Sequence, residues 1–124
     1  MKTYLLRSTS IIAAALFVAS AVYAQAWPNR PIKFVVPFAA GGANDLMARA
    51  AAEGASKVLG QTVVIDNKPG AGSTLGAEFV AKSAPDGYTF LISAAGVISN
   101  HMIKKSMPYK EADLVPVTDR KSVV

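Results

Sequence analysis

The stretch Val35-Val36-Pro37-Phe38-Ala39-Ala40-Gly41-Gly42-Ala43-Asn44-Asp45 decides the fold of this chain. The apolar run 32–36 predicts a buried strand, and Pro37 ends it because proline has no N–H to give to a strand ladder. Gly41 and Gly42 then allow backbone angles that other residues avoid. The side-chain oxygen of Asn44 or Asp45 is expected to cap a helix that begins there. A strand, a glycine turn and a helix start bring backbone N–H groups together, which predicts a binding loop for a small anion such as a carboxylate.

The first 26 residues have the pattern of a secretory signal peptide. Lys2 and Arg7 form a basic start, 11–22 is apolar, and Ala24-Gln25-Ala26 or Val22-Tyr23-Ala24 offers a small-residue cleavage site. An uncleaved membrane anchor is the less favoured alternative, because the apolar run is short for a membrane span. The chain has no cysteine, which excludes disulfides and a lipid on an N-terminal cysteine. We therefore expect the mature protein in a bacterial periplasm.

The charge pattern gives little support to nucleic-acid binding. The formal net charge of +5 falls to +3 when Lys2 and Arg7 leave with the signal peptide. The remaining basic residues are spread along the chain and form no stripe with interleaved aromatic residues. The single histidine, His101, is expected in a loop with a structural or solvent-facing role. With one histidine and no cysteine, the sequence does not support a transition-metal site.

After the first strand, a helix is expected over 44–59 and ends at Gly60. Its apolar face is expected to be formed by Leu46, Ala50, Val58 and Leu59, and its solvated face by the row Arg49, Glu53 and Lys57. Gly54 is expected to mark a close approach of this helix to the sheet. A second strand is expected over 62–65.

The second half of the chain repeats this alternation. A helix is expected over 73–83, capped by Ser73 or Thr74, with Leu75, Phe79 and Val80 facing inward. The run Ala84-Pro85-Asp86-Gly87 predicts a turn, 88–93 a third strand, and Leu114 the start of a fourth. A β-α-β-α-β order implies a parallel sheet, in which ligands bind at the carboxyl ends of the strands. The loops 38–44, 70–74 and 93–96 are therefore expected around one crevice.

Catalytic signatures are missing from these loops. No G-x-S-x-G or phosphate-loop motif is present, and Gly70-x-Gly72-x-x-x-Gly76 is one residue too long for a dinucleotide fingerprint. Turn chemistry accounts for Asp66 and Asp86, while Asp45 lies nearest the predicted ligand loop and either contacts the ligand or caps the helix. The sequence thus predicts a binding protein without catalytic residues, cofactor or metal.

Four motifs resemble the Bug family, the periplasmic solute-binding receptors of tripartite tricarboxylate transporters. They are Trp27-Pro28-Asn29-Arg30-Pro31-Ile32-Lys33, Pro37 to Asp45 with Arg49, Asn67-Lys68-Pro69-Gly70-Ala71-Gly72, and Ala84-Pro85-Asp86-Gly87-Tyr88-Thr89, and the pattern continues through Pro108-Tyr109, Asp113 and Val115-Pro116-Val117. The resemblance implies an α/β fold of the type II periplasmic binding protein kind, a parallel sheet flanked by helices. It also implies that backbone groups and ordered water in the strand-to-helix loops hold a ligand carboxylate.

The resemblance carries over to specific residues and partners. The candidate ligand-binding residues are Phe38, Ala39, Ala40, Gly41, Gly42, Asn44, Asp45, Gly70, Ala71, Gly72, Ser73, Thr74, Ser93, Ala94 and Ala95. The implied ligand is a small carboxylate, which leaves dicarboxylates, tricarboxylates, amino acids, aromatic acids and nicotinate-like compounds open. The implied protein partners are the membrane subunits of a tripartite transporter, contacted transiently. The two alternatives are a sensing module that signals to a membrane partner and an exported α/β enzyme acting on small acids.

Family members are much longer, so 27–118 is expected to be the N-terminal part of the first solute-binding domain. Such a piece is expected to be poorly stable alone and to bind ligand weakly or not at all, because open sheet edges and apolar surface remain. The tail 119–124 departs from the family pattern after Thr118 and reads as the in-frame translation of a common sequencing adapter. We expect this tail to be non-native.

Overall fold

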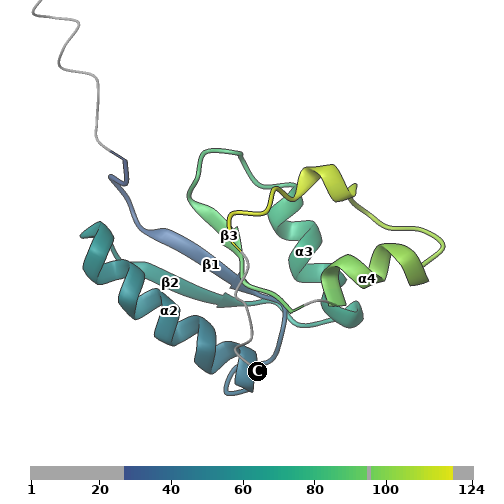
Figure 1. The fold of residues 1–124 in the computed structure, drawn as a ribbon, viewed down its shortest axis with the longest axis horizontal. Helices are drawn as coiled ribbons and strands as arrows, with labels where there is room; N and C mark the ends of the chain where they lie inside the picture. The colour runs from purple at the N-terminus through teal and green to yellow at the C-terminus, as the bar shows by residue number, and fades with distance from the viewer. Residues whose placement is uncertain (1–26, 95, 119–124) are drawn as a thin grey trace, which may run out of the picture.

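The computed structural model describes residues 27–94 and 96–118 (Figure 1). The expected signal peptide, Ala95 and the tail 119–124 lie outside the described residues. The described chain forms a parallel sheet of three strands, β1 (Ile32–Val36), β2 (Val63–Asn67) and β3 (Thr89–Leu91), in the order β2-β1-β3. The predicted α/β class with a parallel sheet is confirmed, and the first strand has its predicted bounds.

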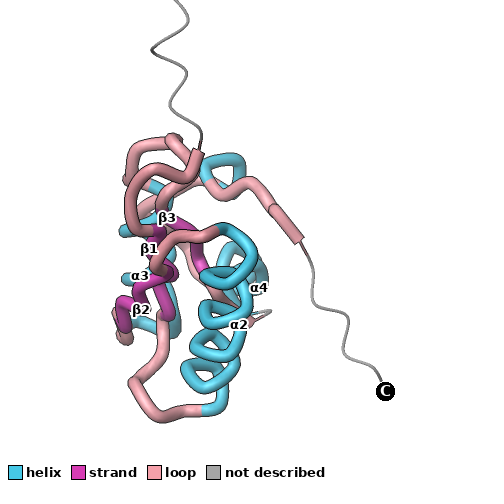
Figure 2. The backbone as a smooth tube through the Cα atoms, turned by 90° about the vertical axis from the view of Figure 1, so that its left-hand side faces the viewer, coloured by secondary structure: helices cyan, strands magenta, loops and turns pink. Residues whose placement is uncertain are grey.

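Helices cover both faces of this sheet. α2 (Ala43–Leu59) packs against β1 and β2, whereas α3 (Thr74–Ala81) packs against β1 and β3, and Figure 2 shows the strands between these two helices. α3 follows a short turn, η2 (Ala71–Ser73), which also contacts α4 (Gly96–Ile103). The last element is η3 (Glu111–Asp113). From β1 the chain continues to β2 on one side, and it then crosses back over β1 to β3 on the other side. The strand order therefore reverses next to β1, and open α/β sheets bind ligands at such a reversal.

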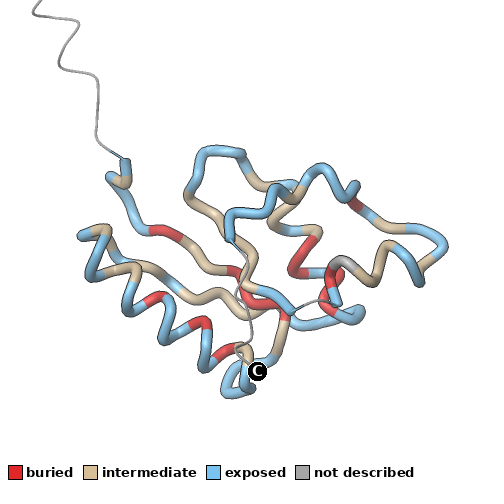
Figure 3. The backbone as a smooth tube through the Cα atoms, in the orientation of Figure 1, coloured by how far each residue is buried: buried red, intermediate tan, exposed pale blue. Residues whose placement is uncertain are grey.

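The central strand forms the driest part of the molecule. Ile32, Val35 and Val36 are at most 1% exposed, because β1 has a strand on each side and a helix over each face (Figure 3). On both sides the register is parallel, with Phe34 opposite Ile65 and Phe90. The β-branched run of the sequence therefore fills the core as predicted.

α2 packs through small residues, which corrects the predicted apolar face. Ala48 and Ala52 are buried, whereas Leu46 is 60% and Val58 85% exposed. Ala50 is also exposed, and Leu59 is half-buried. The alanine stripe lets the helix lie close to the sheet, and the larger aliphatic residues then point outward. An added Cβ at Gly54 would meet nothing within 4 Å, so its predicted close approach to the sheet is wrong, while the predicted end at Gly60 is confirmed by a left-handed backbone with φ 66°.

α3 departs from its predicted face for the same reason. Its buried residues are Thr74, Gly76 and Ala77, and Leu75 and Phe79 are 52% and 39% exposed. A Cβ at Gly76 would lie 2.8 Å from Cβ of Pro37 and 3.1 Å from the carbonyl oxygen of Lys68. The helix thus approaches the first two loops through a glycine, and this approach excludes a larger side chain on that face.

α4 and the segment after it correct two further predictions. His101 lies in α4 rather than in a loop, and its ring meets Tyr109 edge to face with centroids 5.0 Å apart. Tyr109 belongs to a small core with Ala77 and Val97. Leu114 packs against that core as an irregular segment and does not begin a fourth strand among the described residues.

A polar and aromatic cluster joins the first and fourth sequence motifs at the amino end of the sheet. The Tyr88 hydroxyl donates to Asn29 Oδ1 at 2.8 Å and accepts from the Asn29 backbone N–H at 3.0 Å. Arg30 lies 4.1 Å from the Tyr88 ring centroid and pairs with Asp86 at 2.6 Å. The Trp27 ring completes the cluster, 6.1 Å from Tyr88. These motifs therefore hold the end of the sheet opposite the predicted ligand loops.

Candidate ligand-binding site

The first loop is held from behind by the buried carboxylate of Asp45. Its Oδ2 accepts the Gly41 backbone N–H at 2.8 Å and the Arg49 Nε–H at 2.9 Å, and its side chain is 1% exposed. Its Oδ1 accepts the side-chain amide of Asn67 at 2.9 Å. The same Asn67 nitrogen donates to the carbonyl oxygen of Phe38 at 3.1 Å. Both ends of the loop are thereby fixed to α2 and to the end of β2.

These contacts lower the pKa of Asp45. The hydrogen bond from Arg49 contributes most, followed by those from Gly41 and Asn67, and together they bring the pKa from 3.8 to about 2 despite the burial of the carboxyl. The same contact raises the pKa of Arg49. Asp45 is therefore ionised at neutral pH, and Arg49, with its side chain 52% exposed, balances the charge.

The predicted capping of α2 by Asn44 or Asp45 is wrong. The residue before the helix is Gly42, and no side chain caps the N-terminus. Asp45 lies in the first turn and reaches back to Gly41, whose φ of 81° requires glycine-like freedom. A carboxylate in the first turn also interacts favourably with the positive end of the helix dipole. The backbone N–H groups at the start of α2 thus have no side-chain partner from the cap position.

The second loop has an unusual backbone. Three consecutive residues, Ala71, Gly72 and Ser73, have φ of 49°, 64° and 74°, and Gly70 before them has φ of 134°. The predicted capping by Ser73 is wrong, because no side chain caps α3. Left-handed conformations are costly for residues with a Cβ, so neighbouring groups must hold Ala71 and Ser73 in place.

Asn100 of α4 and Lys104, the residue that follows α4, make contacts that hold this loop. Asn100 Nδ2 donates to the carbonyl oxygen of Gly72 at 2.6 Å, and Lys104 Nζ donates to the carbonyl oxygen of Ala71 at 2.6 Å. Lys104 also donates to the hydroxyl of Thr74. Since that oxygen accepts, the hydroxyl hydrogen of Thr74 is left to donate elsewhere. Asn67, Asn100 and Lys104 are not among the candidate residues predicted from the sequence, because their roles depend on partners 22 to 33 residues away.

The third loop follows β3. The Ile92 N–H donates to the carbonyl oxygen of Val35 at 2.9 Å and so continues the pairing with β1 beyond the strand. Ser93 and Ala94 are exposed, and Ala95 lies outside the described residues. Since the three strands are parallel, the loops after β1, β2 and β3 share the carboxyl edge of the sheet. The structure thus brings the described candidate residues of all three loops to one edge.

The chemical groups at the carboxyl edge of the sheet are suited to binding a small ligand. Backbone amides, small side chains and hydroxyls predominate among the candidate residues, and the buried carboxylate is already fully engaged. Within the described ranges, no group of three or more metal-ligating side chains comes together. In the same part of the chain, no helix has the length and apolar character needed to cross a bilayer. This edge can hold an anion through backbone donors.

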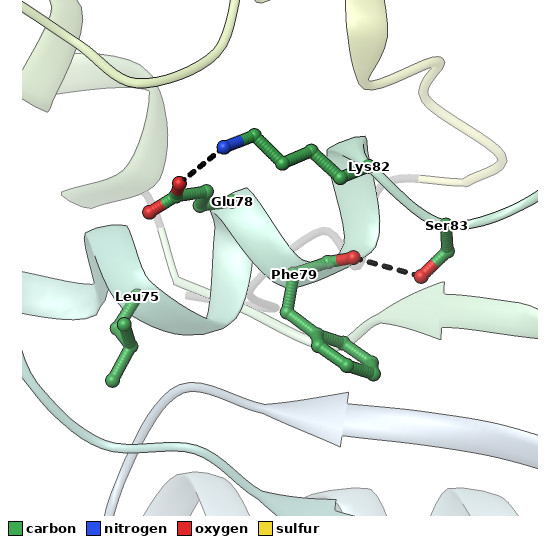
Figure 4. Close-up of a pocket in the computed structure, with 5 residues that line it drawn as sticks. All are labelled: Leu75, Glu78, Phe79, Lys82 and Ser83. Atoms are coloured by element: carbon green, nitrogen blue, oxygen red, sulfur yellow. Dashed lines mark hydrogen bonds and ion pairs between the residues drawn. The ribbon is translucent and has the colours of Figure 1, made fainter.

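A surface hollow lies elsewhere, on the outer side of α3. Leu75, Glu78, Phe79, Lys82 and Ser83 line it, and Figure 4 shows the Glu78–Lys82 ion pair on one side of the helix with Leu75 and Phe79 on the other. The ion pair measures 2.5 Å, and the Ser83 hydroxyl donates to the carbonyl oxygen of Phe79 at 2.7 Å. The polar groups of this hollow are paired with each other, and none of its lining residues is a candidate of the three loops.

A parallel sheet whose loops after β1, β2 and β3 share one edge is the architecture of a solute-binding protein of the periplasmic binding protein class. The family described as tripartite tricarboxylate transporter family receptor matches residues 47–123, and the chain belongs to this family. Its members are receptors, not enzymes. Protein BugT of Bordetella pertussis is 44% identical over 119 residues, which are 94% of this chain and 36% of that protein. The chain thus spans about a third of the length of this relative.

Solved structures agree with the fold. The R. palustris protein Rpa4515 with adipate is 41% identical and superposes with a TM-score of 0.66, over 70% of this chain and 29% of that one. MatC from Rhodopseudomonas palustris with bound malate is 48% identical, with a TM-score of 0.51, over 52% of this chain and 22% of that one. The periplasmic binding protein BugD is 54% identical over 52% of this chain and 22% of its own, with a TM-score of 0.51. These similarities confirm the predicted family and the type of sheet.

Proposed function

We propose that this chain supplies the first ligand loops of a receptor that captures a small dicarboxylate in the periplasm for a tripartite transporter. The observation that carries the proposal is the meeting of three small-residue loops at the carboxyl edge of a parallel sheet. Two similar proteins hold adipate and malate in their structures, and both compounds are dicarboxylates. Residues 27–118 then form the N-terminal part of the first domain, and 1–26 direct export.

The electrostatics of the first loop support an anionic ligand. The negative charge of Asp45 is buried and is compensated by Arg49 at 2.9 Å, so it does not repel a carboxylate above the loop. Both of its oxygens accept hydrogen bonds. Asp45 therefore acts as a support for the loop, while backbone N–H groups at the starts of α2 and α3 provide donors for the ligand.

The membrane subunits of a tripartite transporter are the proposed partners. The family name supports this assignment, and the contact would be transient because the receptor must deliver its ligand and leave.

A chimera tests the ligand class. Residues 27–118 replace the matching segment of the R. palustris adipate-binding relative, and isothermal titration measures binding of adipate, malate and the uncharged diamide of adipate. We expect a dicarboxylate to bind more tightly than the diamide, because hydrogen bonds to an ionised acceptor are stronger than those to a neutral amide oxygen. A folded chimera that binds neither dicarboxylate, or that binds the diamide equally well, overturns the proposal. The recipient protein serves as the control for folding and titration.

A further inference from the structure

We propose that Asn100 and Lys104 are positioning residues that fix the second loop in the conformation that receives the ligand. This inference rests on the proposed carboxylate-binding function and assigns a role to α4 within it. It begins with the backbone of Ala71, Gly72 and Ser73, which have positive φ in succession. A left-handed conformation is unfavourable for a residue with a Cβ, so this turn needs support from outside itself.

The support comes from Asn100 in α4 and from Lys104, directly after α4, and acts on carbonyl groups. Lys104 Nζ and Asn100 Nδ2 each lie 2.6 Å from a loop carbonyl oxygen, that of Ala71 and that of Gly72 respectively. Lys104 also donates to the hydroxyl of Thr74, the first residue of α3. One cation therefore joins both ends of the turn, and hydrogen bonds from a charged donor are stronger than neutral ones.

The direction of these bonds has a consequence for the amides. In a trans peptide, the C=O of one residue and the N–H of the next point in opposite directions. When the Ala71 carbonyl points to Lys104, the Gly72 N–H points away from α4. When the Gly72 carbonyl points to Asn100, the Ser73 N–H likewise points away from α4. Asn100 and Lys104 thus set the direction of two amides in a loop that the family resemblance assigns to carboxylate binding.

Space around the turn agrees with this role. An added Cβ at Gly72 would meet Asn100 Oδ1 and Lys104 Nζ at 3.9 Å, so α4 lies directly against the turn. Figure 1 shows α4 beside the turn that precedes α3, and the two elements are in contact. Asn100 and Lys104 are both half-buried, and the Lys104 N–H donates to the carbonyl oxygen of Asn100, so the two residues lie one turn apart at and just after the end of α4. The loop is therefore held from α4 and the residue after it, and not by its own residues alone.

Hydrogen exchange on the full 124-residue chain tests the clamp without any ligand. We compare Lys104→Met and Asn100→Asp with the matched control Lys105→Met, which makes the same change at the exposed neighbouring residue. We expect the amide of Thr74, whose N–H donates to the carbonyl oxygen of Ala71, to exchange about tenfold faster in the first two variants, because the loss of one hydrogen bond that holds this turn is worth about that factor. Lys104→Arg keeps a charged donor and is expected to restore slow exchange. Equal exchange in Lys104→Met and Lys105→Met overturns the proposal.

Ligand binding is then measured in the chimera described above. We expect Lys104→Met to weaken dicarboxylate binding about tenfold while the Lys105→Met chimera keeps its affinity and both keep the same melting temperature within error. If the unmodified chimera binds no dicarboxylate, the proposed function fails, and the exchange measurement still decides whether the clamp exists. If the chimera binds and Lys104→Met leaves the affinity unchanged, the positioning role is overturned.

Discussion

The side-chain nitrogen of Asn67 lies 2.9 Å from Oδ1 of Asp45 and ties the end of β2 to the first turn of α2. The second hydrogen of the same nitrogen reaches the carbonyl oxygen of Phe38, so the donors of this amide are both used. Asp45 completes the arrangement through Gly41 and Arg49. These contacts of Asn67 and Asp45 therefore fix the first loop between the end of β2 and the first turn of α2.

Replacement of Asp45 by asparagine is expected to lower the melting temperature by several degrees. The shape is kept, but the new NH₂ group must face one of the donors that Gly41, Arg49 and Asn67 now supply. A buried donor without an acceptor is costly. Thermal unfolding followed by circular dichroism measures the effect, with Glu53→Gln at an exposed ion pair as the control. An Asp45→Asn protein as stable as the control would contradict the supporting role of this carboxylate.

The same residue predicts a pH dependence of stability. The pKa of Asp45 is lowered from 3.8 to about 2, so between these values the unfolded chain binds more protons than the folded one. Stability from this group is fully present above pH 3.8 and is lost as the pH falls through about 2. Urea unfolding across this interval should show a smaller pH slope in Asp45→Asn than in the unmodified chain. Equal slopes would show that Asp45 titrates alike in both states.

Two glycines in helices predict opposite effects of the same substitution. Gly76→Ala places a Cβ 2.8 Å from Pro37, and relief of that clash is expected to cost about 1–3 kcal/mol of unfolding free energy. Gly54→Ala meets nothing within 4 Å and is expected to stabilise α2 by about 1 kcal/mol. Urea denaturation of both variants measures the difference. If the two substitutions change stability in the same direction, the close approach of α3 to the first loop is wrong.

Local patterns in the sequence predicted the fold well where one residue determines the outcome. Pro37 and the apolar run before it predicted the bounds of β1, and Gly60 predicted the end of α2. The order of strands and helices predicted the parallel sheet, and parallel strands bring their following loops to one edge. Each of these inferences depends on backbone geometry that nearby residues set.

The helix faces could not be predicted in the same way. Leu46 and Val58 recur at a helical period and were therefore predicted on the buried face of α2. Ala48 and Ala52 are buried instead, because α2 packs closely against the sheet through small residues. Asn100 and Lys104 carry no local signal, and the motif that contains Asn67 does not reveal its partners, since the partners of all three lie far along the chain. α4 was not predicted because a helix of eight residues is marginal by itself and is stabilised by contacts with η2 and α3.

The position of Tyr88 predicts that loss of its hydroxyl lowers the unfolding free energy and leaves ligand affinity unchanged. Tyr88→Phe removes the hydroxyl that pairs with Asn29 and is expected to lower the unfolding free energy by about 1 kcal/mol. The ring contacts with Trp27 and Arg30 remain. Because this cluster lies at the amino end of the sheet, dicarboxylate affinity of the chimera should stay the same. A loss of affinity larger than the loss of stability would place Tyr88 in the ligand site.

Ala71 predicts a gain of stability with a loss of binding. Ala71→Gly relieves a φ of 49°, worth about 1–2 kcal/mol, and glycine's freedom in the unfolded chain offsets about 0.4–1 kcal/mol of this gain. The net expectation is a gain of up to about 1.5 kcal/mol, whereas Ala51→Gly at an exposed position of α2 should lose about 1 kcal/mol. Urea denaturation measures both variants, and a loss in Ala71→Gly equal to that in Ala51→Gly would contradict the strain.

Glycine at position 71 also lets the turn leave its held conformation. We therefore expect the chimera with Ala71→Gly to bind a dicarboxylate less tightly, because the strained alanine keeps the amides of the second loop aligned before the ligand arrives.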